Sequence, residues 1–409
     1  MKHQETKKQL KKGVLAATLL AGMMLTACGG NTSTQGTSGG NSKDAKPIKI
    51  GVLVDKSGKG ADWGKKQEIA ATIAAEEINA AGGINGSKIE LIFKDTGGKN
   101  ESAVKLTRDL DQEKAAAIAG PFFSGECEVA FPVANQLKLP IISASSAKPG
   151  VSANNRPWAF RNSMTDDKLL NNAIPKFVKH FNVKKIAIIH DEQDAWSKSV
   201  GTALFPQILK KNNVQISNEG DFITFKTGTT DFSAAVTKLK SLNPDAIAFG
   251  GLYGEAASFA KEMERQGFKK PVIGGVGMYS AALIQQGGKA VENFVATADW
   301  NPDRPDPKVK AFVDKFTPIA QKITPADPSP GHFEANMYET IHVTADILKK
   351  ANKNGSSDLA DLRETIKQGW TTLKGYPGIT GTFAIDSAGD GDKENYPLII
   401  KNGKYEILN

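Results

Sequence analysis

Short apolar runs alternate with helix-length amphipathic segments along most of this sequence, and this alternation is the feature that most limits its fold. In the first half, apolar runs over 48–54, 88–95, 115–119 and 139–143 are separated by segments with helical periodicity. Strands that alternate with helices form parallel sheets covered by helices on both faces. The sequence therefore predicts an α/β fold built on a doubly wound parallel sheet.

The same alternation starts again after Arg161. Further apolar runs over 185–190, 215–222, 245–249 and 272–274 are again separated by helical segments. A chain of 409 residues is too long for one ordinary core. We therefore expect two similar α/β lobes, followed by further helices and short C-terminal strands.

The N-terminal 27 residues have the pattern of a secretory signal. Five lysines and one glutamate give this segment +4 of the formal net charge of +8, and an apolar stretch over 13–24 is too short to span a membrane. The stretch ends in Leu25-Thr26-Ala27-Cys28, which resembles the bacterial lipobox. We expect a lipoprotein signal peptide over 1–27, lipidation of Cys28 and a flexible Gly/Ser/Thr-rich tether over 28–45. Ordinary signal cleavage is the alternative.

Charge and cysteine content argue against a nucleic-acid-binding protein and against an internal disulfide. The lysine pairs are scattered near expected helix ends, where cations favour the helix dipole, so nucleic-acid binding is not expected. Besides Cys28 there is one cysteine, Cys127, which rules out an internal disulfide between the two once Cys28 is lipidated. We expect Cys127 to be a buried structural thiol.

The stretch over 120–125, which we call the socket loop, is the first candidate site. It follows the apolar run 115–119 and begins with Gly120-Pro121, which breaks regular structure. Ser124 stands where the N-cap of the next helix is expected. A helix that begins at the carboxyl end of a parallel strand offers free N–H groups, so the sequence predicts a site for a small anionic group beside Phe122 and Phe123.

Several segments together carry a family resemblance. They are, in order, 48–52 (IKIGV), 62–64 (DWG), 75–86 (AEEINAAGGING), 120–124 (GPFFS), 142–146 (ISASS), 185–187 (KIA), 244–247 (PDAI) and 381–390 (GTFAIDSAGD). With them the chain resembles the solute-binding proteins of ABC importers of the branched-chain amino acid, leucine-binding-like type, which have the type I periplasmic-binding-protein fold.

The resemblance implies two lobes joined by three hinge crossovers, with the solute in the cleft between them. Matching segments place the crossovers near 163–165, 295–298 and 380–383. The first lobe would comprise 46–164 and 297–380, and the second 165–296 and 381–409. The implied mechanism is hinge closure around the solute and delivery to a membrane permease, whose ATPase subunits are further partners.

The resemblance also implies which residues bind the solute. Ser124, Ser145 and Ser146 match the segments that hold a ligand carboxylate, while Ala147 stands where the family often has a hydroxyl. Ser124 can also be a plain N-cap, and the two roles are compatible. Rings are expected to cover the solute, and these are Trp63, Phe122, Trp196 and Tyr253, of which any can instead be core.

Val276 marks a departure from the family pattern. Amino-acid binders of this type commonly have an acidic residue there, which pairs with the ligand ammonium. A buried ammonium without a partner is costly. Either another acid substitutes, with Glu255 and Asp299 as candidates, or the ligand is a carboxylate without an ammonium group.

The sequence gives little support for an enzyme. Ser124 is not in a G-x-S-x-G elbow, no phosphate-binding loop is present, and the five histidines show no metal spacing. No cofactor and no metal is expected. We predict a membrane-anchored, extracytoplasmic receptor for a small amino acid or related carboxylate, aromatic ones included. The alternative is a receptor of the same fold that serves a signalling partner.

Overall fold

The computed structural model describes residues 46–409. The signal peptide expected over 1–27, Cys28 and the expected tether over 28–45 lie outside the described residues. In the described part of the chain, no helix has both the length and the apolar character needed to cross a membrane.

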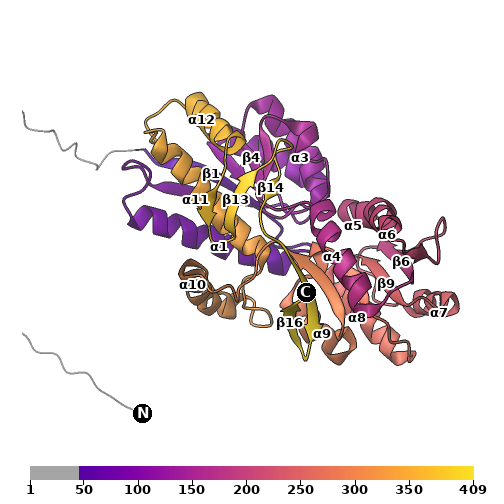
Figure 1. The fold of residues 1–409 in the computed structure, drawn as a ribbon. Helices are drawn as coiled ribbons and strands as arrows, with labels where there is room; N and C mark the ends of the chain where they lie inside the picture. Colours follow the sequence, from indigo (N-terminus) through magenta and orange to yellow (C-terminus); the bar gives the residue numbers. More distant parts are fainter. Residues whose placement is uncertain (1–45) are drawn as a thin grey trace, which may run out of the picture. The chain divides into compact units, whose positions relative to one another are not determined.

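The first sheet has five parallel strands in the order β2-β1-β3-β4-β5 (Figure 1). The strands are β1 (Ile48–Val54), β2 (Ile89–Asp95), β3 (Ala117–Ala119), β4 (Ile141–Ser143) and β5 (Ala159–Arg161). The helices are α1 (Ala61–Ala80), α2 (Asn100–Gln112), α3 (Ser124–Leu137), α10 (Pro307–Ile323), α11 (His332–Lys350) and α12 (Leu359–Thr371). Val52 belongs to the core shared with α1 and α11, while Leu53 belongs to the core shared with α2 and α3. Both faces of the sheet are therefore covered, which explains the continuous apolar runs.

The second sheet has six parallel strands and two antiparallel ones, in the order β16-β15-β11-β10-β9-β6-β7, with β8 also paired to β6 (Figure 1). The strands are β6 (Lys185–Asp191), β7 (Gln215–Ile216), β8 (Ile223–Phe225), β9 (Ala246–Gly250), β10 (Val272–Gly274), β11 (Phe294–Ala298), β15 (Tyr396–Lys401) and β16 (Lys404–Ile407). The helices are α4 (Asp166–Phe181), α5 (Ala195–Ser199), α6 (Phe205–Lys211), α7 (Ser233–Leu242), α8 (Tyr253–Arg265) and α9 (Ala281–Gly287). The predicted α/β fold with two parallel-sheet lobes is confirmed.

Two predicted elements differ in detail. Of the strand expected over 215–222, only 215–216 forms a strand, β7, and the next strand, β8, begins at Ile223. Between them the Asn218 side chain takes the place of a strand residue and bonds both main-chain groups of Ile188, at 2.9 and 2.8 Å. The helical segment expected between the runs 185–190 and 215–222 is interrupted by a π-helical turn at Val200–Leu204. Pro206, two residues beyond this turn, has no N–H to donate, which favours such an interruption.

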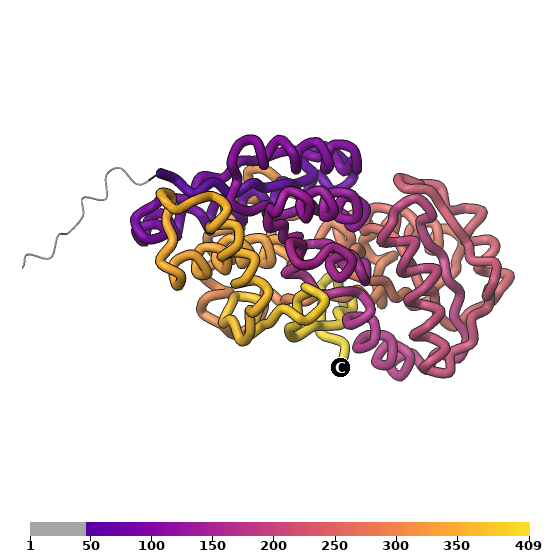
Figure 2. The backbone as a smooth tube through the Cα atoms, turned by 90° about the horizontal axis from the view of Figure 1, so that it is seen from above, coloured from indigo at the N-terminus to yellow at the C-terminus, as the bar shows by residue number. Residues whose placement is uncertain are grey.

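The chain passes between the sheets three times, around 162–165, 299–306 and 393–395. The last two crossovers lie later than expected. β11 stays in the second sheet to Ala298, and β13 (Gly381–Ile385), in a small sheet with β12 (Tyr376–Gly378) and β14 (Gly391–Asp392), buries Phe383 in the core of the first lobe. The segment 389–391 runs beside 161–163, with the Arg161 N–H bonded to the Gly389 carbonyl at 2.8 Å and the Gly391 N–H to the Ser163 carbonyl at 3.2 Å. Figure 2 shows the yellow C-terminal part of the chain running from the first lobe toward the middle of the body.

A buried lysine connects the three crossovers. Lys393, in the third, donates to Asn162 in the first at 3.2 Å and to Asn336 of α11 at 2.8 Å. Asp299, in the second, accepts the Met164 N–H at 3.0 Å and lies 4.0 Å from the Lys393 ammonium. Burial alone would raise the pKa of Asp299, but Lys393 and His332 outweigh it and hold that pKa at about 2.

Candidate functional site

The socket loop lies at the carboxyl end of β3, as expected. Gly120 has a φ of +117°, and a Cβ atom there would lie 2.2 Å from the Leu53 carbonyl oxygen, so only glycine fits. α3 begins at Ser124, but the capping group is Glu126, whose carboxylate accepts the Phe123 N–H at 2.9 Å. The expectation that Ser124 is the N-cap is therefore wrong, and its hydroxyl is available for other contacts.

Residues 144–148, which we call the serine loop, follow β4 and lie against the socket loop. The Ser143 hydroxyl donates to the Pro121 carbonyl at 2.7 Å and accepts the N–H groups of Ser145 and Ser146 at 3.3 and 3.1 Å. The hydroxyls of Ser124 and Ser146 are 2.9 Å apart. Parallel strand order thus brings two loops that are 20 residues apart into one polar surface.

A cavity of ≈ 30 Å³ lies between this surface and the second lobe. Eight of the nine predicted binding residues line it, namely Trp63, Phe122, Ser124, Ser145, Ser146, Ala147, Trp196 and Val276. The ninth, Tyr253, does not line it; its ring packs edge-on against Trp63 at 4.8 Å and its hydroxyl donates to Asp62 at 3.3 Å. Five further residues line the cavity: Phe123, which the sequence placed beside the anion site without making it a binding residue, and Asp194, Leu252, Gly277 and Phe333, which the sequence missed.

Aromatic rings from the first lobe form one wall of the cavity. Trp63 stacks on Phe122 with 5.5 Å between ring centroids, and Phe333 of α11 meets both rings edge-on. From sequence, Asp194 could have been added because it lies two residues before Trp196. Phe333 could not, because it is brought in by a helix more than 200 residues later.

Trp196 covers the cavity from the second lobe. Its indole N–H donates to Asp166 at 2.5 Å, which fixes the ring, and a Cβ atom at Gly277 would lie 2.6 Å from that ring. Asp166 is buried at the start of α4, and burial raises its pKa to about 7 despite the hydrogen bond from Trp196.

Asp194 is the one acidic side chain that lines the cavity within the described residues. One of its carboxylate oxygens caps α5 through the Ser197 N–H at 2.8 Å, and the other pairs with the Lys59 ammonium of the first lobe at 2.5 Å. Lys59 also lies over the Phe123 ring, 4.5 Å from its centroid. The negative charge at the cavity therefore already has a cationic partner.

The two acids considered as substitutes at Val276 lie elsewhere. Glu255 accepts the Gly228 N–H at 2.9 Å, and Asp299 bonds His332 and Asn336 behind the crossovers. Neither lines the cavity. Cys127 is buried and its pKa is raised by burial to about 12, which confirms the expected buried thiol.

A larger hollow of ≈ 800 Å³ lies in the second lobe between α8 and α9, and Met263, Lys269 and Ile284 are among its lining residues. We favour the smaller cavity as the functional site, because only there do buried hydroxyl groups and rings from both lobes converge. Among residues 46–409 no group of three or more histidine, cysteine, aspartate or glutamate side chains is arranged to hold a metal ion.

The sequence profile of the periplasmic binding protein family matches residues 47–396. The chain belongs to this family. An amino acid binding protein of Pseudomonas aeruginosa is 30% identical over 98% of this chain and 100% of its own length. These findings confirm the resemblance inferred from the sequence.

Solved structures show the same periplasmic binding protein architecture. LivJ of Streptococcus pneumoniae, a branched-chain amino acid transporter substrate-binding protein in complex with isoleucine, is 28% identical, with a TM-score of 0.75 over 88% of this chain and 98% of its own. LivK of Thermotoga maritima, a leucine binding protein, is 27% identical, with a TM-score of 0.75 over 88% of this chain and 97% of its own.

Proposed function

We propose that this chain is the solute receptor of an ABC importer, anchored to the outer face of the cell membrane through lipidated Cys28. It binds a small amino acid or related carboxylate between its lobes, closes around it by hinge motion and delivers it to a membrane permease. The observation that carries the proposal is the convergence of three serine hydroxyls and an aromatic wall on one cavity between the lobes. Hydroxyl donors suit a carboxylate, and rings suit an apolar side group.

The charge balance at the cavity bears on the class of ligand. A ligand ammonium needs a buried anionic partner, and Asp194 already pairs with Lys59. Val276 adds no charge. We propose that the ligand is a carboxylate whose ammonium, if it has one, is not the main determinant of affinity.

The test is a ligand panel on residues 46–409, read as the shift in melting temperature. L-Leucine is compared with 4-methylpentanoate, and L-phenylalanine with 3-phenylpropanoate, so that each pair differs only by the ammonium group. A ligand at 100 times its Kd adds about 2.7 kcal/mol to the free energy of unfolding. We expect at least one carboxylate to bind, and each acid lacking the ammonium to bind within about tenfold of its amino acid, a difference of about 1.4 kcal/mol.

Two results would contradict parts of the proposal. If no carboxylate shifts the melting temperature, the assignment of the cavity is wrong. If amino acids bind tightly and their counterparts without the ammonium do not, the ligand needs that group. Uptake of the identified solute by cells that carry the Cys28→Ala variant would test the anchor and the importer separately, since a freely released receptor should support less uptake.

A further inference from the structure

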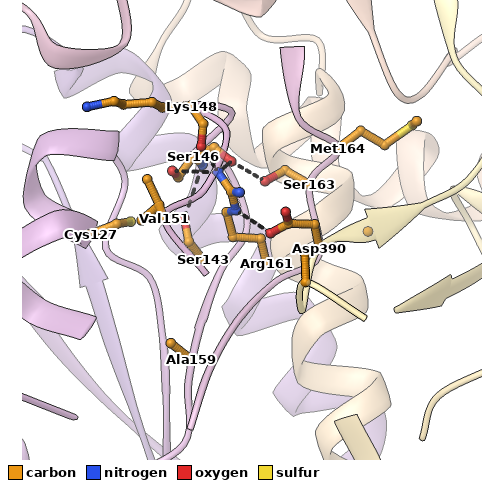
Figure 3. A network of polar contacts seen from close by, with 12 residues as sticks. Cys127, Ser143, Ser146, Lys148, Val151, Ala159, Arg161, Ser163, Met164 and Asp390 are labelled. Atoms are coloured by element: carbon orange, nitrogen blue, oxygen red, sulfur yellow. Dashed lines mark hydrogen bonds and ion pairs between the residues drawn. The ribbon is translucent and has the colours of Figure 1, made fainter. Parts of the chain in front are cut away.

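Arg161 is a buried cation directly behind the polar wall of the cavity. It ends β5, its side chain is fully buried, and it does not line the cavity itself. Figure 3 shows its guanidinium between Asp390 on one side and the serine loop on the other. Burying a guanidinium is costly, so its contacts indicate what it does there.

The guanidinium divides its donors between these two sides. Its Nε donates to Asp390 at 2.7 Å. Its Nη1 donates to the carbonyls of Lys148 and Ser146, the latter at 3.3 Å, and makes a long contact of 3.4 Å to the Ser146 hydroxyl. Its Nη2 has no hydrogen-bond partner among residues 46–409. The cation is therefore shared by the serine loop and the chain segment that leads to the third crossover.

These contacts favour one direction of the hydroxyl hydrogen bonds, because a guanidinium can only donate and a hydroxyl whose oxygen accepts from a cation becomes a stronger donor. The Ser146 oxygen accepts from Arg161, so we assign the Ser146 hydrogen to Ser124, whose oxygen is 2.9 Å away. The Ser124 oxygen also accepts the Lys148 N–H at 3.3 Å. With both of its lone pairs engaged, the Ser124 hydroxyl has its own hydrogen left to donate into the cavity.

Charge acts in the same direction as this chain of hydrogen bonds. Asp390 balances the charge of Arg161 but lies on the Nε side, so the pair is a dipole whose positive end faces the serine loop. In a buried setting such a dipole polarises each hydroxyl in turn. A carboxylate at Ser124 accepts the hydroxyl hydrogen and is also attracted by the positive end of the dipole. A primary amide has no charge to be attracted, and its NH₂ group is a donor facing a donor.

We propose that Arg161 is a positioning residue that makes the cavity select an ionised carboxylate over the matching amide. The inference rests on the proposed function, since it concerns the group that the same cavity holds. Arg161 acts through Ser146 and Ser124 and does not touch the solute. Without Arg161, the hydrogen bond between the Ser146 and Ser124 hydroxyls can reverse its direction, and the preference for the carboxylate over the amide falls.

The test measures the ratio of affinities for an acid and its amide on residues 46–409, with benzoate against benzamide and L-leucine against L-leucinamide. The main variant is Arg161→Met/Asp390→Asn, which removes both charges together. The matched control is Arg363→Met/Asp111→Asn, because Arg363 is another buried arginine that bridges a carbonyl and an aspartate, at Ala115 and Asp111. We expect the acid-to-amide ratio to fall about tenfold in the main variant, equivalent to about 1.4 kcal/mol, and to stay at the wild-type value in the control.

Arg161→Lys is a second variant that keeps the test valid if the main variant does not fold. It keeps the charge but cannot bond Asp390 and the serine loop at once, so we expect an intermediate ratio. An unchanged ratio in every folded Arg161 variant overturns the inference while the proposed function stands. If the wild type binds neither acid nor any other carboxylate, the proposed function fails first, and the inference fails with it.

Discussion

At the scale of single residues, the Ser124 hydroxyl is the group on which the binding proposal depends most. Because Glu126 caps α3, Ser124 is not needed to begin the helix, and it bonds Ser146 and the Lys148 N–H instead. Its loss should therefore affect solute binding more than stability.

We expect Ser124→Ala to weaken binding of the preferred carboxylate by about 5- to 150-fold. The loss of one buried hydrogen-bond donor to an anionic ligand costs about 1–3 kcal/mol of binding free energy. Isothermal titration calorimetry measures the change. Ser152→Ala is the matched control, because Ser152 is also fully buried in the first lobe but does not line the cavity. Equal affinities in wild type and Ser124→Ala would return Ser124 to a purely structural role.

Much of the binding surface could be predicted from sequence, because parallel strands end at one sheet edge and the loops that follow them are short. Strand order predicted Ser124 at this edge, and the family resemblance added Ser145 and Ser146. The sequence could not pair Lys59 with Asp194, which are 135 residues apart and lie on different lobes. Nor could it place Arg161, since a lone arginine after a short strand gives no sign of its burial.

At the scale of elements, the start of α4 links a crossover to the cavity. Asp166 accepts from the Trp196 indole and lies 3.4 Å from the Thr297 hydroxyl of β11. No cation bonds this carboxylate in the described part of the chain, which is why burial dominates its pKa. The π-helical interruption between α5 and α6, and the break between β7 and β8, which both pair with β6, show where tertiary contacts override local periodicity.

We expect Asp166→Asn to flatten the pH dependence of stability. The Asp166 carboxyl has its ordinary pKa of 3.8 in the unfolded chain and a pKa of about 7 in the folded protein. Its contribution to the free energy of unfolding is therefore complete below pH 3.8 and is lost as the pH rises to 7. The variant should remove a decrease on the order of a few kcal/mol between pH 4 and 7. Urea unfolding at pH 4, 5.5 and 7.5 measures it.

Asp167→Asn is the control for this experiment, because Asp167 is the next residue on α4 and is partly exposed. Glu126, whose pKa burial also raises to about 7, contributes a dependence of the same sign, so the slope should be reduced and not abolished. A slope in Asp166→Asn as steep as in wild type would show that Asp166 is already ionised in the folded protein at low pH.

At the scale of the whole body, contacts between the lobes hold the cleft closed. The pair Lys59–Asp194 joins them beside the cavity, and the Ser280 hydroxyl of the second lobe donates to Asp327 of the first at 3.2 Å. The two-lobe plan followed from the sequence alone. The positions of the second and third crossovers did not, because they depend on which sheet β11 and β13 join.

We expect Lys59→Met to favour the open arrangement of the lobes. A partly exposed ion pair contributes about 0.2–1 kcal/mol, so the ratio of open to closed molecules should rise about 1.4- to 5-fold. The radius of gyration from small-angle X-ray scattering, with and without a saturating ligand, measures the change. Lys56→Met is the control, because Lys56 pairs with Glu68 inside the first lobe at 2.7 Å. If both variants scatter alike, Lys59 does not hold the lobes together.

The small cavity has a kinetic consequence. A space of ≈ 30 Å³ has room for about one water molecule, far below the roughly 300 Å³ of an ordinary ligand pocket. A solute has no room in this arrangement, so the lobes must separate before it enters and again before it leaves, and the rate of their separation limits both loading and release. A membrane partner that draws the lobes apart would then speed unloading for every cargo alike, without touching the cargo at all.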